Sequence, residues 1–243
     1  MLSLSRVGLG SLFAVALGVA PAFADVIFTD NTFNLANYSK SATFTSDPSV
    51  SIATTSSGGT LQFVSTFTNG SLPGTPTTSQ GLVNNFFAIN PLLQGAITSI
   101  DASVMKNLAV DFSGTGFGNT FRPTIEQDGV FYLAAIAGPT LNGPGSTGFH
   151  TLSQTGLTAA NFLSYDFTTG VFGTANPNFD GDTMLFGLTQ ITGVSGTTGH
   201  VTAQYEDLTL DVHGARAVPE PGTIALFGTA LLGLGWLNRR KSA

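Results

Sequence analysis

The densest group of oxygen-bearing side chains in the sequence lies in a short run rich in asparagine and aspartate. Asn176, Asn178, Asp180 and Asp182 occupy alternate positions, with a glycine between the last two. An EF-hand calcium loop begins in this way, but its twelfth position, which needs a bidentate glutamate, is Gly187 here. The EF-hand interpretation therefore fails. Two alternatives remain, a weak Ca²⁺ site in a loop or a turn held by its own side chains. No other cofactor is expected.

Catalytic chemistry is not predicted by any residue pattern in this chain. His150, His200 and His213 lack the short spacings that place two imidazoles on one element. The G-x-S-x-G motif of nucleophile-elbow hydrolases does not occur. No cysteine is present, which excludes thiolate nucleophiles, disulfides and sulfur-ligated metals. Acids that could pair as in a glycosidase stand in no distinguishing motif: Asp101, Asp111, Glu126, Asp166 and Glu206.

The charge distribution argues against a nucleic-acid partner. Of the eight Lys and Arg residues, only four lie between residues 25 and 218, against 13 acids. This central segment carries a net charge near −9, whereas phosphates require a basic surface. Charged residues make up only 9% of the whole chain, so hydroxyl and amide groups must supply most of its polar surface.

The first 24 residues have the composition of a secretory signal peptide. Arg6 precedes an apolar run, which closes on Ala22-Phe23-Ala24. Small residues at Ala22 and Ala24 are what signal peptidase recognises, so we expect the mature chain to begin at Asp25. A short transmembrane anchor is the alternative, but the apolar run is shorter than a bilayer requires.

The last 29 residues combine a proline-flanked acid, an apolar run and a basic cluster. Val218, Pro219, Glu220 and Pro221 are followed by 15 uncharged, mostly apolar residues at positions 223–237, and then by Arg239, Arg240 and Lys241. The two prolines favour an extended, exposed segment that a protease can reach. We expect the apolar run to form a single thin transmembrane helix, with the basic cluster as its cytoplasmic stop.

This order of features resembles the PEP-CTERM sorting signal of Gram-negative bacteria that make extracellular polysaccharide. The resemblance covers about 26 residues and implies recognition by an exosortase near Pro219-Glu220-Pro221. It implies a precursor in the inner membrane that is later delivered to the cell surface or extracellular matrix. Signal peptidase, exosortase, the inner membrane and extracellular polysaccharide are the expected partners.

Between the two ends, the chain is predicted to form one all-β domain. Short alternating runs separated by Gly, Pro, Asn, Ser and Thr are typical of sandwiches and barrels. We expect strands at residues 49–55, 60–67, 82–89, 97–105, 108–112, 121–127, 130–137, 148–153, 183–191 and 200–212. The predicted domains are a signal peptide (1–24), a β-sandwich body (25–214) and the sorting signal with its helix (215–243).

Three local features of this body can be predicted in more detail. Asp128-Gly129 between two apolar runs fits a two-residue type I′ hairpin. The apolar residues change parity near Glu206-Asp207, which predicts a β-bulge that keeps both sets inside. A short helical turn is expected at residues 157–162, with Thr158 as its N-cap.

The stretch from residue 97 to residue 212 also resembles the jelly-roll bodies common among PEP-CTERM proteins. The resemblance rests on Phe121-Arg122-Pro123, the hairpin at Asp128-Gly129, residues 153–162 and Phe186-Gly187. It implies a jelly-roll-like β-sandwich related to carbohydrate-binding and lectin-like modules. We therefore expect a non-enzymatic surface or matrix protein that binds exopolysaccharide. The alternatives are a secreted glycan-active hydrolase or lyase, and a purely structural matrix subunit.

Overall fold

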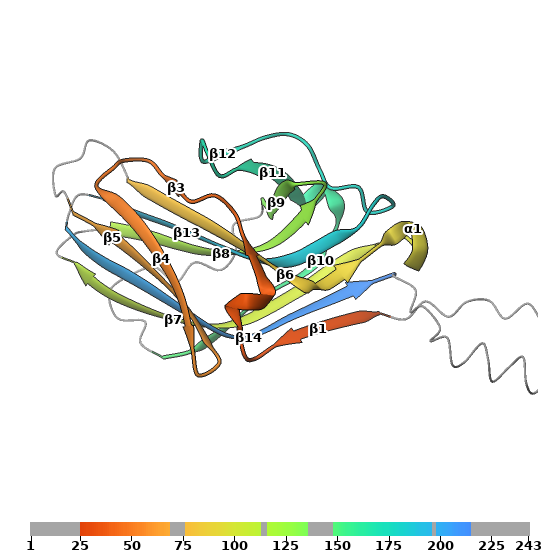
Figure 1. The fold of residues 1–243 in the computed structure, drawn as a ribbon, viewed down its shortest axis with the longest axis horizontal. Coiled ribbons are helices and arrows are strands. Elements are labelled where there is room, and N and C mark those ends of the chain that lie inside the picture. Colours follow the sequence, from red (N-terminus) through yellow and green to blue (C-terminus); the bar gives the residue numbers. More distant parts are fainter. Residues whose placement is uncertain (1–24, 69–75, 113–115, 136–147, 196–197, 215–243) are drawn as a thin grey trace, which may run out of the picture.

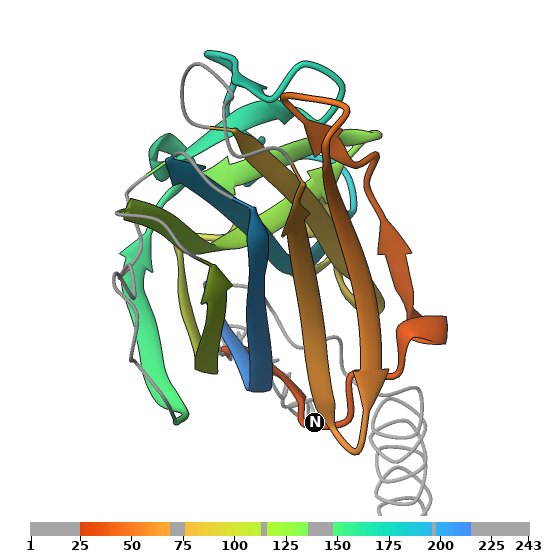
Figure 2. The same ribbon diagram turned by 90° about the vertical axis from the view of Figure 1, so that its left-hand side faces the viewer.

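Two antiparallel β-sheets packed face to face make up the described part of the chain. The computed structural model describes residues 25–68, 76–112, 116–135, 148–195 and 198–214. The fold is the expected all-β, jelly-roll-like sandwich (Figures 1 and 2). The expected signal peptide and the C-terminal apolar run lie outside the described residues. None of the helices in the described ranges has the length and apolar character needed to cross a membrane.

The smaller sheet has the order β10-β7-β14-β5-β4, and β1 pairs with one half of β14. Its strands are β1 (Val26–Asp30), β4 (Val50–Ser57), β5 (Thr60–Phe67), β7 (Ser99–Phe112), β10 (His150–Leu157) and β14 (Gly199–His213). β14 is the central strand, since it pairs with β7 along its length and with β5 and then β1 on its other side.

The larger sheet has the order β12-β11-β9-β8-β13-β6-β2, with β3 also pairing with β6. Its strands are β2 (Tyr38–Lys40), β3 (Phe44–Thr45), β6 (Thr77–Ile89), β8 (Gly116–Gln127), β9 (Val130–Ala134), β11 (Phe162–Asp166), β12 (Val171–Phe172) and β13 (Met184–Ser195). Three short helices lie between strands: η1 (Leu35–Asn37), α1 (Pro91–Gln94) and η2 (Ala159–Asn161).

The local predictions for the hairpin, the bulge and the helical turn are confirmed. Asp128 and Gly129 both have positive φ, 56° and 78°, as a type I′ turn requires. The register of β14 shifts between Glu206 and Thr209, and Asp207 has a φ of 50°. The helical turn is the 3-10 helix η2, with Thr158 at its N-cap. In each place the side-chain pattern and the turn chemistry are local, and so could be recognised in the sequence.

Several strand boundaries were predicted wrongly. The expected break between residues 105 and 108 does not exist, because β7 runs continuously through Lys106 and pairs with β14 on both sides of it. Strand β6 begins at Thr77 rather than at residue 82, since its polar first half is paired on both sides. Strands β1, β2, β3, β11 and β12 were not predicted, being short or lacking clear alternation.

A buried lysine explains the false break in β7. Lys106 is fully buried, and its Nζ donates to the backbone carbonyl of Asn119 at 3.2 Å and lies 5.7 Å from the ring centre of Tyr205. The Tyr205 hydroxyl in turn donates to Gln190 Oε1. Burial lowers the pKa of Lys106 to about 7. The sandwich core therefore contains a polar layer between its two sheets.

A second apolar cluster lies on the outer face of the larger sheet. Leu133, Tyr165 and Phe167 are buried there, with Phe131, Phe172 and Ile191 packed against them. Phe167 fits against Gly81, where an added Cβ would lie 2.8 Å from the ring atom Cζ. The loop after β11 therefore covers part of the outer face of the larger sheet. This cluster lies on the side of the molecule opposite β1 (Figures 1 and 2).

Candidate functional site

Two adjoining surface hollows lie beside this second cluster, around the end of β11. The first has a volume of about 330 Å³ and the second about 300 Å³. Val130, Tyr165 and Asp166 border both hollows. The first is completed by Ser164, Thr169, Val171, Phe172 and Gly173, and the second by Ala42, Gly129, Phe131, Phe167 and Thr168. Together they form what we call the β11 surface.

Asp166 is the charged group of the β11 surface, and its own turn holds it in place. Its carboxylate accepts hydrogen bonds from the Thr168 amide at 2.7 Å and from the Thr169 hydroxyl at 2.8 Å. These two bonds lower the pKa of Asp166, so the carboxylate is ionised at neutral pH. Each carboxylate oxygen has two acceptor positions, so capacity remains for a hydroxyl from a ligand.

Aromatic rings form the floor of the β11 surface. The Tyr165 ring packs edge-on against Phe167 at 4.8 Å and Phe172 at 4.9 Å between ring centres. Burial raises the pKa of Tyr165, and its hydroxyl pairs with Ser79 Oγ at 3.0 Å. The guanidinium of Arg122 lies 5.2 Å from the Phe172 ring centre and also donates to the Ala134 carbonyl. The floor is therefore held from below by packing and hydrogen bonds.

The rim of the β11 surface is partly apolar. Val171 and Val130 are 60% and 40% exposed, whereas the core apolar side chains of the described chain are buried. Val171 pairs directly with Asp166 across β12 and β11. The Asp166 carboxylate and the hydroxyl groups of Ser164, Thr168 and Thr169 thus lie beside exposed apolar groups. This combination suits a ligand with both polar and apolar faces.

The β11 surface was not predicted from the sequence. Asp166 was considered only as one acid among several, and strands β11 and β12 were not expected. The run Asp166-Phe167-Thr168-Thr169-Gly170 carries a signal that could have been used, since an aspartate two residues before a threonine favours an Asx turn. The grouping itself depends on the pairing of β11 with β9 and β12.

The oxygen-rich run at Asn176, Asn178, Asp180 and Asp182 forms a turn anchored by β8. The amide of Asn178 donates to Gln127 Oε1 at 2.8 Å, and Gln127 Nε2 donates to the carbonyls of Asn178 and Asp182 at 3.1 Å each. The side-chain oxygen of Asn178 accepts from the Asp180 amide at 3.1 Å. These bonds account for the turn without a cation, and the weak Ca²⁺ site stays a prediction.

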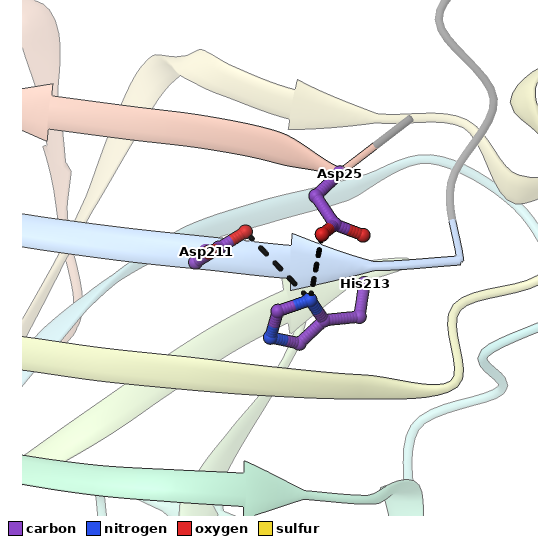
Figure 3. Close-up of side chains that lie close together, drawn as sticks. All are labelled: Asp25, Asp211 and His213. Atoms are coloured by element: carbon purple, nitrogen blue, oxygen red, sulfur yellow. Dashed lines mark ion pairs between the residues drawn. The ribbon is translucent and has the colours of Figure 1, made fainter. Parts of the chain in front are cut away.

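Asp25, the expected first residue of the mature chain, lies in a cluster with His213 and Asp211 (Figure 3). The imidazole Nδ1 of His213 lies 3.2 Å from Asp25 and 3.9 Å from Asp211, and Nε2 lies 3.4 Å from Asp101. Partial burial lowers the pKa of His213, but the hydrogen bonds to Asp25 and Asp101 and the charge of Asp211 outweigh it and raise the pKa overall. This cluster joins the start of β1 to the end of β14.

The remaining predicted site residues lie outside the described residues. They are Ala22 and Ala24 of the signal-cleavage site, Val218, Pro219, Glu220 and Pro221 of the sorting motif, and Arg239, Arg240 and Lys241 of the membrane stop. A comparison with protein families nevertheless tests the sorting motif. Residues 217–241 match the PEP-CTERM protein-sorting motif. The chain carries a PEP-CTERM motif.

The PEP-CTERM match indicates an exported, exosortase-sorted protein that passes through a membrane-anchored stage. No curated protein matches the chain. Among solved structures it is similar to winged bean acidic lectin complexed with methyl-alpha-D-galactose (11% identity, 80% of this chain and 100% of that chain, TM-score 0.41). It is also similar to a family 11 carbohydrate-binding module from Clostridium thermocellum (10% identity, 81% of this chain and 99% of that chain, TM-score 0.35). A third similar structure is arcelin-5 from Phaseolus vulgaris (10% identity, 78% of this chain and 99% of that chain, TM-score 0.40).

Proposed function

We propose that this protein is a non-enzymatic surface or matrix component that binds extracellular polysaccharide at the β11 surface. The observation that carries the proposal is the position of the Asp166 carboxylate between two hollows with exposed apolar rims. A sugar ring presents hydroxyls around its edge and C–H groups on its faces, so it needs both kinds of contact.

The arrangement of the hollows also favours a polymer over a single sugar. The two hollows share Val130, Tyr165 and Asp166, so neighbouring residues of one polysaccharide could occupy them side by side. Figure 1 places β12 far from the end of β14, where the tail with the sorting motif begins. A polysaccharide could therefore reach the β11 surface while the body is still attached to the membrane.

Binding is better supported than hydrolysis at this place. Glycosidases use a pair of carboxylic groups on either side of the scissile bond. Among the residues that line the two hollows, Asp166 is the single acid. A carboxylate alone can orient a sugar hydroxyl, but it does not supply both the proton donor and the base or nucleophile.

The experiment measures binding of the host's own exopolysaccharide to the exported protein by calorimetry. Asp166→Asn keeps an acceptor for the Thr168 amide but removes the charge, so we expect about a tenfold loss of affinity. Asp111→Asn, an exposed acid on β7 of the other sheet, is the matched control and should bind as the wild type does. Equal affinity of the two variants, or no binding by the wild type, would reject the proposal.

A further inference from the structure

An exposed pair of leucines lies beside the point where the chain leaves the sandwich toward its sorting motif. Leu92 and Leu93 of α1 are 65% and 76% exposed. Asn90 and Gly95 bound this one-turn helix, which connects β6 of the larger sheet to β7 of the smaller one. Two adjacent leucines so exposed bury little apolar surface in the sandwich, so packing against it does not explain them.

Two contacts hold the connection between α1 and β7 against the end of β14. The Thr98 amide donates to the His213 carbonyl at 2.9 Å. Gly214, with a φ of 89°, is so close to the α1–β7 connection that an added Cβ would lie 2.9 Å from the Ala96 carbonyl oxygen. Figure 1 shows α1, the end of β14 and the start of β1 at the same side of the molecule. The leucines therefore lie at the side from which the tail departs.

The position of the sorting motif determines which surface meets the membrane first. The motif begins at residue 217, and the apolar run that should enter the bilayer begins at residue 223. The eight residues between Gly214 and residue 223 can extend about 30 Å at most, so the precursor's body is held close to the bilayer. The side that carries α1 is the side nearest the attachment point.

We propose that Leu92 and Leu93 insert into the lipid interface of the inner membrane and dock the precursor's body against it. This inference rests on the membrane-anchored stage of sorting and is independent of polysaccharide binding. The tether makes the docking intramolecular, so two leucines suffice where they would not hold a free protein. Asp25, Asp101 and Asp211 lie at the same end, so anionic headgroups should oppose docking and zwitterionic lipid should favour it.

Docking would limit how the sorting segment is presented. With α1 at the interface, Gly214 lies near the bilayer surface, so the sorting motif that follows it in the sequence starts within reach of a membrane-embedded protease. After cleavage the tether is lost, the effective concentration of lipid falls, and the leucines leave the bilayer. The same contact can therefore assist sorting and still permit release.

The absence of cysteine from the chain permits a direct test in the full-length precursor. Leu93→Cys carries an environment-sensitive fluorophore, and Thr198→Cys, exposed at the other end of β14, carries the same label as a control. Each labelled precursor is reconstituted into vesicles of phosphatidylcholine with spin-labelled lipid as quencher. We expect several-fold stronger quenching at position 93 than at position 198, and a reduction of the difference when Leu92→Ser is added.

Three results would overturn the inference, and they are distinguishable. Precursor that does not float with the vesicles would show that the membrane anchor itself is wrong. Precursor that floats but shows equal quenching at positions 93 and 198 would show that the body does not dock. Shielding of position 93 that appears only when exosortase is added would assign the leucines to a protein contact. Because both leucines are exposed, these variants do not disturb the core.

Discussion

His213 Nδ1 lies 3.2 Å from the carboxylate of Asp25, so the last residue of β14 is paired with the residue at which the mature chain is expected to begin. The backbone strengthens this relationship, because Val26 of β1 is the partner of Val212. The expected signal-peptidase site before Asp25 and the sorting motif after Gly214 therefore both adjoin one end of the same strand pair. The side chains of Asp25, Asp101, Asp211 and His213 lie together at this end of the sandwich.

The His213 cluster should make stability depend on pH. The folded pKa of His213 is raised above its ordinary value of 6.5, so the stabilisation is fully present below pH 6.5 and is lost as pH rises through the folded pKa. We expect His213→Gln to lose at most about 1 kcal/mol at low pH, because partly exposed ion pairs are screened. Melting curves across this range test the effect, with the exposed His150→Gln as control. Identical pH profiles for both variants would contradict it.

Lys106 should lower stability, and its removal should raise it. Its folded pKa of about 7 lies below the ordinary 10.5, so between these values the unfolded chain binds more protons and stability rises with pH. Lys106→Met fills the same space without an amine to desolvate, and we expect a gain of about 1–3 kcal/mol at neutral pH. Urea unfolding of both proteins at several pH values measures it. If the unfolding free energy of Lys106→Met rose with pH as steeply as that of the wild type, the Lys106 amine would not be the cause of the pH dependence.

Gly81 should be needed for the β11 surface. Gly81→Ala would place a methyl group 2.8 Å from Phe167 Cζ and 2.9 Å from Thr189 Oγ1, so Phe167 must move. We expect about 1–3 kcal/mol of destabilisation and weaker polysaccharide binding, since Phe167 lines the second hollow. Gly118→Ala has nothing within 4 Å of its Cβ and serves as the control. Unchanged polysaccharide binding by Gly81→Ala would show that the second apolar cluster does not support the binding site.

The sorting motif should be required for release and not for membrane insertion. Replacing Pro219, Glu220 and Pro221 by Ala leaves the 15-residue apolar run intact, so we expect uncleaved protein to accumulate in the inner membrane. Deleting Arg239, Arg240 and Lys241 should instead disturb the orientation of the helix. Fractionation of the host and immunoblotting against the body distinguish the two variants. Normal release of the triple-alanine variant would show that Pro219-Glu220-Pro221 is not needed for sorting and that the tail acts only as a membrane anchor.

Features that depend on neighbouring residues were predictable from the sequence. The type I′ hairpin at Asp128-Gly129 was recognised because only a few residues tolerate positive φ at both positions. The bulge near Asp207 was recognised because a change of parity in an alternating strand has one simple structural explanation. The PEP-CTERM motif was recognised because its residues stand in one fixed order along the chain.

Features that depend on residues far apart in the chain were decided by the tertiary structure. Two separate strands were predicted on either side of Lys106, and only the pairing of β7 with β14 shows that one strand continues through this position. Asp166 looked like any surface acid, and only the pairing of β11 with β12 and β9 places it between two hollows. His213 and Asp25 are separated by nearly the whole body, and the β1–β14 ladder brings them into contact. Strand partners are chosen by burial of complete faces, and this is a property of the assembled sheets that a single segment does not contain.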